Sequence, residues 1–428
     1  MNSFTSYSNE KNFLALILIT LSYWFFMLSD GALRMLVLLY FFKLGFSPIT
    51  LAYLFLLYEF LGMLTNFTAG YLSKNFGIKR ILYSGISLQI FALYFLALVP
   101  MDWQSSLAII VIILFQGLSG VAKDLTKVSS KSAIKLMAPI SKDASLFRWT
   151  AIITGSKNSV KGMGFFLGCF LLVYLDFQNS LLVLGLILTA LFVGLIAKMP
   201  DIKEELKSPT KLVKVFSLDP RINLLSTARL FLFGARDVWF VVGLPIYLAS
   251  ALTQNHFFSA DTAFLIIGVF MASWIILYGI TQSIAPKILS KQMKDNPVGV
   301  SQRWVAYLIF LPALISVASF FNGSEPTIIF TILLIITLLI FGFFFAINSS
   351  LHSYLILLFS PKERVNMNVG FYYMANAAGR LIGTFLSGLS YIFGGLTMCM
   401  IVSASMLFLA WYFTNKMVRS GNSQNKII

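Results

Sequence analysis

The sequence predicts an all-α membrane protein with twelve transmembrane helices in two six-helix halves, and three observations support this fold class. Of the 428 residues, 58% are hydrophobic and only 11% are charged, whereas a soluble domain carries about 25% charged residues. The mean hydropathy over the whole chain is +0.85. The apolar residues also form repeated runs that are long enough to cross a bilayer. These features exclude a water-soluble fold.

Each predicted span is an apolar run of about 20 residues or more, the length needed to cross a hydrocarbon layer about 30 Å thick. The first run continues through Phe41 and Phe42 with no small-residue cleavage site after it. We therefore expect a transmembrane helix there and not a removable signal peptide. The twelve runs lie near residues 13–42, 50–73, 80–99, 104–137, 144–175, 180–197, 221–250, 260–283, 303–321, 325–358, 362–393 and 395–416.

Lysine and arginine positions predict the orientation. With the amino terminus inside, the cytoplasmic segments hold 22 of the 32 basic residues, the external loops hold only Lys43, and nine lie within spans. Basic residues concentrate on the cytoplasmic side of membrane proteins. We therefore expect a lipid-embedded, multi-pass protein of a bacterial inner membrane with both termini in the cytoplasm. The same rule accounts for the net charge of +16, so nucleic acid is not an expected partner.

The longest polar interruption, residues 198–220, separates the sixth and seventh spans. It predicts a cytoplasmic linker between an amino-terminal half, residues 1–197, and a carboxy-terminal half, residues 221–428. Small residues recur in corresponding spans of the two halves, which favours a transporter built from parallel repeats. Three glycines, Gly155, Gly164 and Gly168, recur at an offset of 215 as Gly370, Gly379 and Gly383, and Gly31-Ala32 recurs as Gly234-Ala235.

Missing motifs limit the function classes. The chain has no Gly-Lys dipeptide and hence no Walker A phosphate loop, so any transport has to use ion or substrate gradients. No nucleophile elbow or metalloprotease helix is present, and we expect no enzymatic activity. Two cysteines (Cys169 and Cys399) and two histidines (His256 and His352) give no disulfide framework or metal-binding spacing. We expect no cofactor and no metal.

The most informative residues are ionisable side chains at membrane depth, because each costs about 2.5 kcal/mol or more in hydrocarbon unless it faces a cavity or a partner. Nine cations and four anions lie within the spans, an excess of five positive charges. This distribution predicts a central cavity for a multiply anionic small molecule. The candidate substrate-binding residues are Arg34, Lys123, Lys127, Lys157, Lys161, Arg236 and Arg380; the candidates for proton coupling are Asp30, Glu59, Asp124 and Asp237.

Helical spacing places the lysines on shared faces, since Lys123 and Lys127 are four residues apart, as are Lys157 and Lys161. Arg380 and these last two lysines have no acid on their own helix, which makes them the strongest substrate-facing candidates.

Structural roles compete with substrate binding for the other charges. Asp30 and Arg34 at i,i+4, and Asp124 and Lys127 at i,i+3, have the spacing of intrahelical ion pairs. We expect Arg236 to pair poorly with the adjacent Asp237, because neighbouring helix positions point about 100° apart. Two more basic residues, Lys131 and Arg229, are expected near the membrane interface.

Two further titratable residues have alternative interpretations. Glu59 stands alone on its predicted helix, where a buried carboxyl group can carry a proton; equally, it can be the partner of a lysine on the fourth or fifth span. His352 is expected to be a hydrogen-bonded core histidine.

The loop between the second and third spans, residues 70–80, resembles the signature loop of the major facilitator superfamily. Gly70, Gly77, Lys79 and Arg80 match that signature, while Lys74 replaces its usual aspartate. The resemblance implies the major facilitator fold, with two six-helix halves around a central path.

Four charged stretches resemble the ArsJ family of organoarsenical efflux permeases: residues 29–40, 118–135, 154–162 and 233–245. This resemblance implies a secondary transporter that exports 1-arseno-3-phosphoglycerate and confers arsenate resistance. It also implies a functional link to glyceraldehyde-3-phosphate dehydrogenase, which makes that ester from arsenate. We expect a monomer with a small anionic substrate. The alternatives are a proton-coupled drug or other organic-anion exporter of the same superfamily, and a non-transporting membrane receptor.

Overall fold

The computed structural model describes the backbone of residues 2–98, 106–137, 143–200, 219–254, 258–289, 292, 296–322, 327–361 and 364–424. All regular secondary structure in these ranges is helical, which confirms the predicted all-α fold. The helices are α1 (Asn2–Lys43), α2 (Pro48–Phe76), α3 (Ile78–Leu98), α4 (Ser106–Met137), α5 (Asp143–Lys198), α6 (Pro220–Phe240), α7 (Gly243–Thr253), α8 (Ala260–Leu289), α9 (Pro297–Asn322), α10 (Ile328–Phe359) and α11 (Val365–Gln424).

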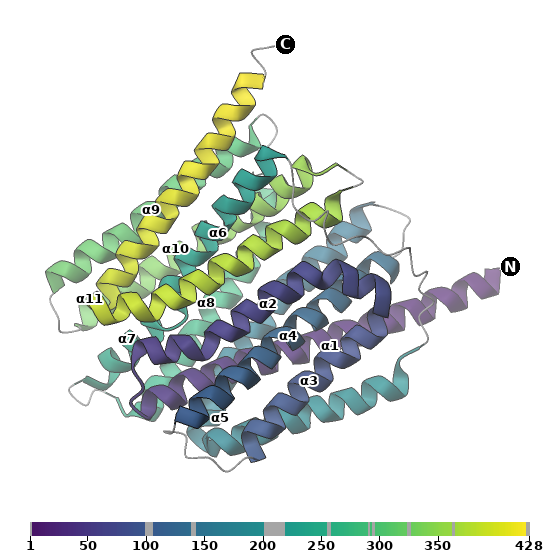
Figure 1. Ribbon diagram of the computed structural model, residues 1–428, viewed down its shortest axis with the longest axis horizontal. Coiled ribbons are helices and arrows are strands. Elements are labelled where there is room, and N and C mark those ends of the chain that lie inside the picture. The colour runs from purple at the N-terminus through teal and green to yellow at the C-terminus, as the bar shows by residue number, and fades with distance from the viewer. Residues whose placement is uncertain are drawn as a thin grey trace.

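Two of these helices turn back on themselves, and each therefore accounts for two predicted spans. At about 1.5 Å per residue, the 56 residues of α5 and the 60 residues of α11 are too long for one crossing. The α5 backbone leaves helical geometry at Asp176, whose carboxylate accepts a 2.9 Å hydrogen bond from the Asn179 amide and caps the second leg. The α11 break lies at Gly394 and Gly395, and Figure 1 shows the chain reversing direction there, with the two legs diverging from the turn.

The predicted span at 221–250 is interrupted, which the sequence analysis did not anticipate. Its two parts, α6 and α7, are separated at Val241 and Val242. The amides of Val242 and Gly243 donate to the Ser387 hydroxyl at 3.2 and 3.1 Å. Pro245 follows at the start of α7 and has no amide hydrogen to continue the helical ladder. The two helices together still form one apolar crossing, Pro220–Thr253.

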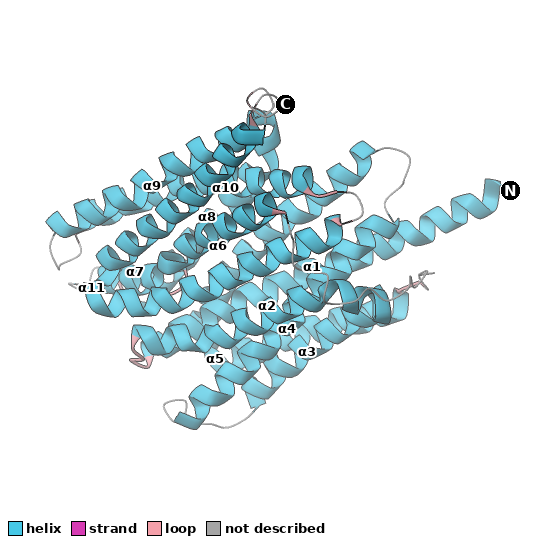
Figure 2. Cartoon of the chain, turned by 45° about the horizontal axis from the view of Figure 1, so that its top comes forward, coloured by secondary structure: helices cyan, strands magenta, loops and turns pink. Residues whose placement is uncertain are grey.

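The helices form two groups that lie side by side in both views of the molecule (Figures 1 and 2). Helices α1–α5, the N-terminal group, pack mainly on one another. So do the helices of the C-terminal group, α6–α11, except α8, which packs most extensively on α5. Contacts between the groups are made chiefly by α2 with α11 and by α5 with α8. The predicted linker lies largely outside the described residues, so its domain boundaries remain a prediction.

Two of the three repeated glycine pairs occupy equivalent helix crossings in the two groups, whereas Gly370 meets nothing within 4 Å. In each crossing a glycine lies so close to the backbone of a facing helix that an added Cβ would overlap a carbonyl oxygen. Gly164 and Gly168 of α5 face Leu28 and Ala32 of α1, and Gly379 and Gly383 of α11 face Leu230 and Gly234 of α6. The facing residues are 202 positions apart, so Arg34 and Arg236 also occupy equivalent positions. The predicted match of Gly31 with Gly234 is therefore wrong by one residue, because Ala32 is the equivalent of Gly234.

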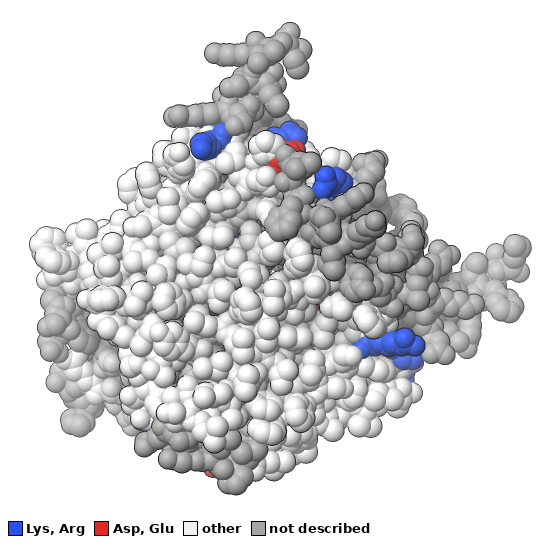
Figure 3. All heavy atoms as spheres, viewed as in Figure 1, with Lys and Arg blue, Asp and Glu red and all other residues white. Residues whose placement is uncertain are grey.

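The outer surface is suited to lipid. Large apolar side chains such as Phe310, Phe321 and Ile329 are 70%, 82% and 83% exposed. The face in Figure 3 is uncharged over most of its area, and the described lysines and arginines visible on it lie along its edges. Ten described helical segments have the length and hydropathy of membrane spans, and the chain is a multi-pass membrane protein.

Candidate substrate cavity

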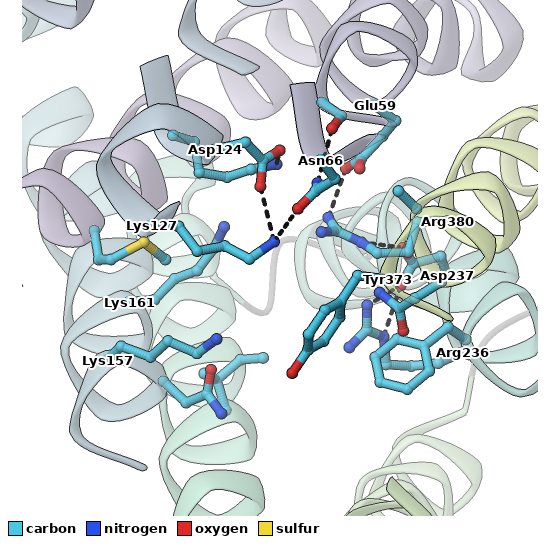
Figure 4. Close-up of a pocket in the computed structure, with 18 of the residues that line it drawn as sticks. Glu59, Asn66, Asp124, Lys127, Lys157, Lys161, Arg236, Asp237, Tyr373 and Arg380 are labelled. Atoms are coloured by element: carbon cyan, nitrogen blue, oxygen red, sulfur yellow. Dashed lines mark hydrogen bonds and ion pairs between the residues drawn. The ribbon is translucent and has the colours of Figure 1, made fainter. Parts of the chain in front are cut away.

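A polar cavity of about 210 Å³ lies between the two helix groups, with walls from α1, α2, α4, α5, α6, α8, α10 and α11. All seven candidate substrate-binding residues line it, although they come from five different helices. Three of the four candidate proton carriers, Glu59, Asp124 and Asp237, also line it. The fourth, Asp30, contacts the cavity residue Lys161. Figure 4 shows Lys157 and Lys161 on one wall and Arg236 and Arg380 on the facing wall.

Glu59 joins the two helix groups through arginines. One carboxylate oxygen accepts hydrogen bonds from Arg34 Nη2 at 2.7 Å and from Arg380 Nη2 at 2.6 Å. Arg34 belongs to the N-terminal group and Arg380 to the C-terminal group. The partners of Glu59 are therefore arginines and not the expected lysine of the fourth or fifth span. Both arginines belong to other helices than Glu59, so spacing along one helix could not predict these pairs.

Asp237 is the second shared carboxylate. It accepts from Arg236 Nε at 2.6 Å and from Arg380 Nε at 3.2 Å. The expectation that Arg236 and Asp237 pair poorly is wrong, because the long arginine side chain bends back far enough to reach its neighbour. Arg380 thus binds one carboxylate from each helix group at once, which places its guanidinium at the centre of the cavity.

Asp30 is paired across helices and not along its own. Its two oxygens accept from Lys161 Nζ at 2.6 Å and from the Tyr58 hydroxyl at 2.5 Å. The ion pair suggested between Asp30 and Arg34 is therefore not the one that forms. The Tyr58 ring also lies under Lys123, whose ammonium is 4.0 Å from the ring centroid, an arrangement that stabilises a desolvated cation.

Asp124 forms the intrahelical pair that its spacing predicts. It accepts from Lys127 Nζ at 2.9 Å and lies 3.5 Å from Lys123 Nζ. Lys127 also donates to the Asn66 side-chain oxygen at 2.6 Å (Figure 4). All four candidate proton carriers therefore act as counter-ions in this structure, and their role in proton coupling remains a prediction.

Arg229 does not lie where the sequence predicted it, near the membrane interface. The side chain is buried and lines the cavity. Its guanidinium donates to Asn376 at 2.9 Å and to the Ser349 carbonyl at 3.1 Å, and it lies 3.9 Å from the Phe233 ring centroid. The position of Arg229 nine residues into α6, about 13 Å along the helix axis, was the sequence signal for this depth.

His352 differs from the expected hydrogen-bonded core histidine. The residue is fully buried, yet within the described part of the chain neither ring nitrogen has a hydrogen-bond partner. The other residue expected near the interface, Lys131, lies outside the residues whose side chains are described.

Within the described ranges, no group of three or more His, Cys, Asp or Glu residues is placed to hold a metal ion.

The charges of the cavity do not balance. Eight cationic side chains line it, the seven candidates and Arg229, and the four carboxylates Asp30, Glu59, Asp124 and Asp237 oppose them. Among the described residues of the cavity, cationic side chains therefore outnumber carboxylates by eight to four. The cavity is not fully enclosed, because the side chains of Lys127 and Arg380 are 19% and 20% exposed.

The cavity is closed on the side where α1 ends and α2 begins. There α2 and α11 touch through their backbones, since a Cβ on Gly388 would lie 2.6 Å from the Pro48 carbonyl oxygen. The rings of Tyr53 and Phe385 stack nearby at 6.4 Å. The lining residues extend from the middle of the helices toward the opposite side, where both chain ends lie.

Comparison with known proteins agrees with this architecture. The family model described as Major Facilitator Superfamily matches residues 19–353. A mutant form of the nucleoside transporter NupG superposes with a TM-score of 0.70 at 18% identity, covering 95% of this chain and 99% of that one. An outward-facing bacterial homologue of the iron transporter ferroportin superposes with a TM-score of 0.64 at 16% identity and the same coverage. No curated protein sequence matches the chain.

The helical bundle and its central polar cavity define a multi-pass membrane carrier. The chain belongs to the major facilitator superfamily. It is a secondary transporter of that superfamily, and membership of a carrier family fits the expectation that it is not an enzyme.

Proposed function

We propose that this transporter exports a multiply anionic organic phosphate or arsenate ester from the bacterial cytoplasm. The resemblance to the ArsJ family suggests 1-arseno-3-phosphoglycerate as the substrate and arsenate resistance as the consequence. The observation that carries this proposal is the surplus of cationic over acidic side chains among the described residues of the cavity, eight against four, contributed by both helix groups. A neutral or cationic substrate would leave that surplus uncompensated in a site that has to close around it.

The cationic groups suit a molecule with an anionic group at each end. Arg236 and Arg380 present planar guanidinium groups, which grip phosphate-like oxygens with paired hydrogen bonds. Lys157 and Lys161 supply point charges on the facing wall (Figure 4). A substrate of this kind bridges the two groups and offsets the repulsion between their cations.

Bridging also supplies a transport mechanism. A ligand shifts a conformational equilibrium only by its difference in affinity between the two states. Contacts to both walls at once are completed when the groups close, so the bound anion favours closure. We propose that both termini lie in the cytoplasm, which would make the cavity open inward and able to load an intracellular substrate. We propose that the unit that carries out this cycle is a monomer.

The runner-up, a proton-coupled drug or other organic-anion exporter, receives less support. Proton coupling requires a carboxylate that gains and loses its proton during transport. Each described carboxylate at the cavity is instead held by at least one cation. A cationic drug would also meet eight cationic side chains in the cavity.

Arsenate resistance tests the proposed function in cells. Arsenate-sensitive bacteria would express the transporter with or without a co-expressed glyceraldehyde-3-phosphate dehydrogenase, in a background in which that enzyme can be depleted. We expect resistance and lower intracellular arsenic only when both proteins are present. Resistance that persists without the dehydrogenase would show that the exported compound is not its arsenate ester.

A further inference from the structure

One side of the Arg380 guanidinium is already occupied by carboxylates from both helix groups. Its Nη2 donates to Glu59 of α2 at 2.6 Å, and its Nε donates to Asp237 of α6 at 3.2 Å (Figure 4). Nε and Nη2 of an arginine together can grip a phosphate-like group with two parallel hydrogen bonds. A substrate anion that binds this side of Arg380 therefore has to take the place of one of the two carboxylates.

The contact between Glu59 and Arg380 belongs to the α2–α11 seam, the packing of these two helices that closes one side of the cavity. It follows the stacked rings of Tyr53 and Phe385, six residues further along α2 and five residues earlier on α11, which is roughly 8–9 Å deeper along the helix axes. Release of a substrate on the closed side requires α2 and α11 to separate there. The Glu59–Arg380 contact therefore has to lengthen or break during transport.

Breaking this contact leaves each residue with an opposite charge in its own helix group. Glu59 keeps Arg34 of α1, which donates to it at 2.7 Å, and Arg380 keeps Asp237 of α6. The strong penalty for a buried ion without a partner is therefore avoided on both sides. The contact of Arg380 with Asp237, by contrast, joins two helices of one group that pack extensively on each other. Glu59 is thus the carboxylate that can leave Arg380.

We propose that Glu59 is a specificity-determining residue, because it holds the place of the substrate's anionic group on Arg380. This inference rests on the proposed export of a two-ended organic anion and identifies the contact on which that anion acts. Glu59 shares a single oxygen between Arg34 and Arg380, whereas a phosphate, arsenate or phosphonate group offers several anionic oxygens to one guanidinium. Such a group replaces Glu59 on Arg380 and so releases α2 from α11.

The same contact discriminates against uncharged ligands. A ligand shifts a conformational equilibrium only through its difference in affinity between the two states. An anion on Arg380 binds the state in which Glu59 has moved away, and it therefore favours opening of the closed side. A neutral ligand in the cavity gives Arg380 no anionic acceptor, so the α2–α11 seam stays closed. Selection for anions then operates in the conformational change as well as in binding.

Distances across the α2–α11 seam test the proposal with the full chain in proteoliposomes. Spin labels would be attached to Ser47→Cys and Phe393→Cys, exposed positions at the closed-side ends of α2 and of the first leg of α11; the native cysteines are buried. Without ligand, we expect a short distance in the wild type. In Glu59→Gln the ratio of long to short distances should rise about tenfold or more, the effect of losing one charge-assisted hydrogen bond. A ligand-free distribution identical to that of the wild type would overturn the proposal.

The matched control is Asp261→Asn. Asp261 of α8 also pairs with the other helix group, through Lys43 of α1 at 3.9 Å, but both side chains are more than half exposed. An exposed ion pair contributes little to stability, so this variant should keep the distances of the wild type.

The wild type gives a second test, which does not depend on the folding of a variant. Saturating 2,3-bisphosphoglycerate should lengthen the distance between the labels, whereas the neutral nucleoside uridine should not. If calorimetry shows that 2,3-bisphosphoglycerate binds and the distance does not change, the proposal is wrong. Equal lengthening by uridine would also overturn it.

Efflux of labelled 3-phosphoglycerate separates this inference from the proposed function. If the wild type carries 3-phosphoglycerate but Glu59→Gln does not change the distances, the proposed substrate class stands and the role of Glu59 is wrong. If inorganic phosphate opens the α2–α11 seam of the wild type but 3-phosphoglycerate is neither bound nor carried, the role of Glu59 stands and the proposed organic substrate is wrong.

Discussion

Glu59 is the residue whose replacement tests the charge arrangement most sharply. Its side chain is only 2% exposed and accepts hydrogen bonds from two arginines, one in each helix group. In Glu59→Gln the shape is kept but the charge is lost, which leaves Arg34 and Arg380 beside a neutral amide. Removing one partner of a buried ion pair typically costs about 3–5 kcal/mol. We expect a loss of about 3 kcal/mol or more in anion-free buffer.

A bound anion should rescue the same variant. A two-ended ligand such as 2,3-bisphosphoglycerate offers new acceptors to the two released arginines. Ligand at 100 times its dissociation constant stabilises a protein by about 2.7 kcal/mol, and tighter binding to the variant would increase this gain. Thermal unfolding of the purified protein, followed by tryptophan fluorescence with and without ligand, measures both effects.

The control for this experiment is Asp261→Asn. Asp261 is 56% exposed and pairs with Lys43 at the surface, so its removal should change stability by about 0.5 kcal/mol or less. If Glu59→Gln were as stable as the wild type and gained no more from the ligand, the view of Glu59 as an internal counter-ion would be refuted. Loss of gradient-driven export with unchanged stability would instead favour Glu59 as a proton carrier.

Three further predictions concern binding and packing. Lys157→Gln should weaken binding of 2,3-bisphosphoglycerate about tenfold or more, as expected for the loss of one charge-assisted contact. Calorimetry on the purified variant measures this affinity. An unchanged affinity would show that Lys157 does not bind the anion. Arg236→Lys and Arg380→Lys should each reduce affinity although the charge is kept, because the planar fork is lost; wild-type affinity in both would place the anion elsewhere. Gly383→Ala should lower the yield of folded protein, because its Cβ would lie 2.5 Å from a carbonyl oxygen of α6. Gly370→Ala on the same helix is the control, because its Cβ meets nothing within 4 Å. Equal yields of the two variants would contradict the close crossing of α11 and α6.

The fold was predictable from the sequence because the bilayer imposes its thickness on every span. Apolar runs of about 20 residues located the crossings, including the two returns at Asp176 and Gly394–Gly395 that divide α5 and α11. The interruption between α6 and α7 was missed, because Val241 and Val242 are as apolar as their neighbours. Only Gly243 and Pro245 signalled it, and both residues are common within membrane helices.

The sequence predicted which residues line the cavity, but it did not predict which carboxylate pairs with which cation. Depth and charge type selected seven side chains that line one cavity, since an ionisable group in a membrane has to face a cavity or a partner. Which carboxylate meets which cation depends on side chains from different helices, such as Glu59 and Arg380, 321 positions apart. Spacing along one helix carries no information on such contacts, which is why the Asp30–Arg34 pair was wrong and the Asp124–Lys127 pair was right.

The most direct test of the central claim compares the transport of charged and uncharged solutes by the wild type and by one variant. Proteoliposomes with phosphate outside would be loaded with labelled 3-phosphoglycerate or with a labelled neutral nucleoside, and the variant is Arg236→Gln combined with Arg380→Gln. The account predicts rapid efflux of 3-phosphoglycerate through the wild type, little efflux through the variant, and no carriage of the nucleoside by either. Nucleoside efflux as fast as that of 3-phosphoglycerate, or undiminished 3-phosphoglycerate efflux through the variant, would contradict a cavity built for anions.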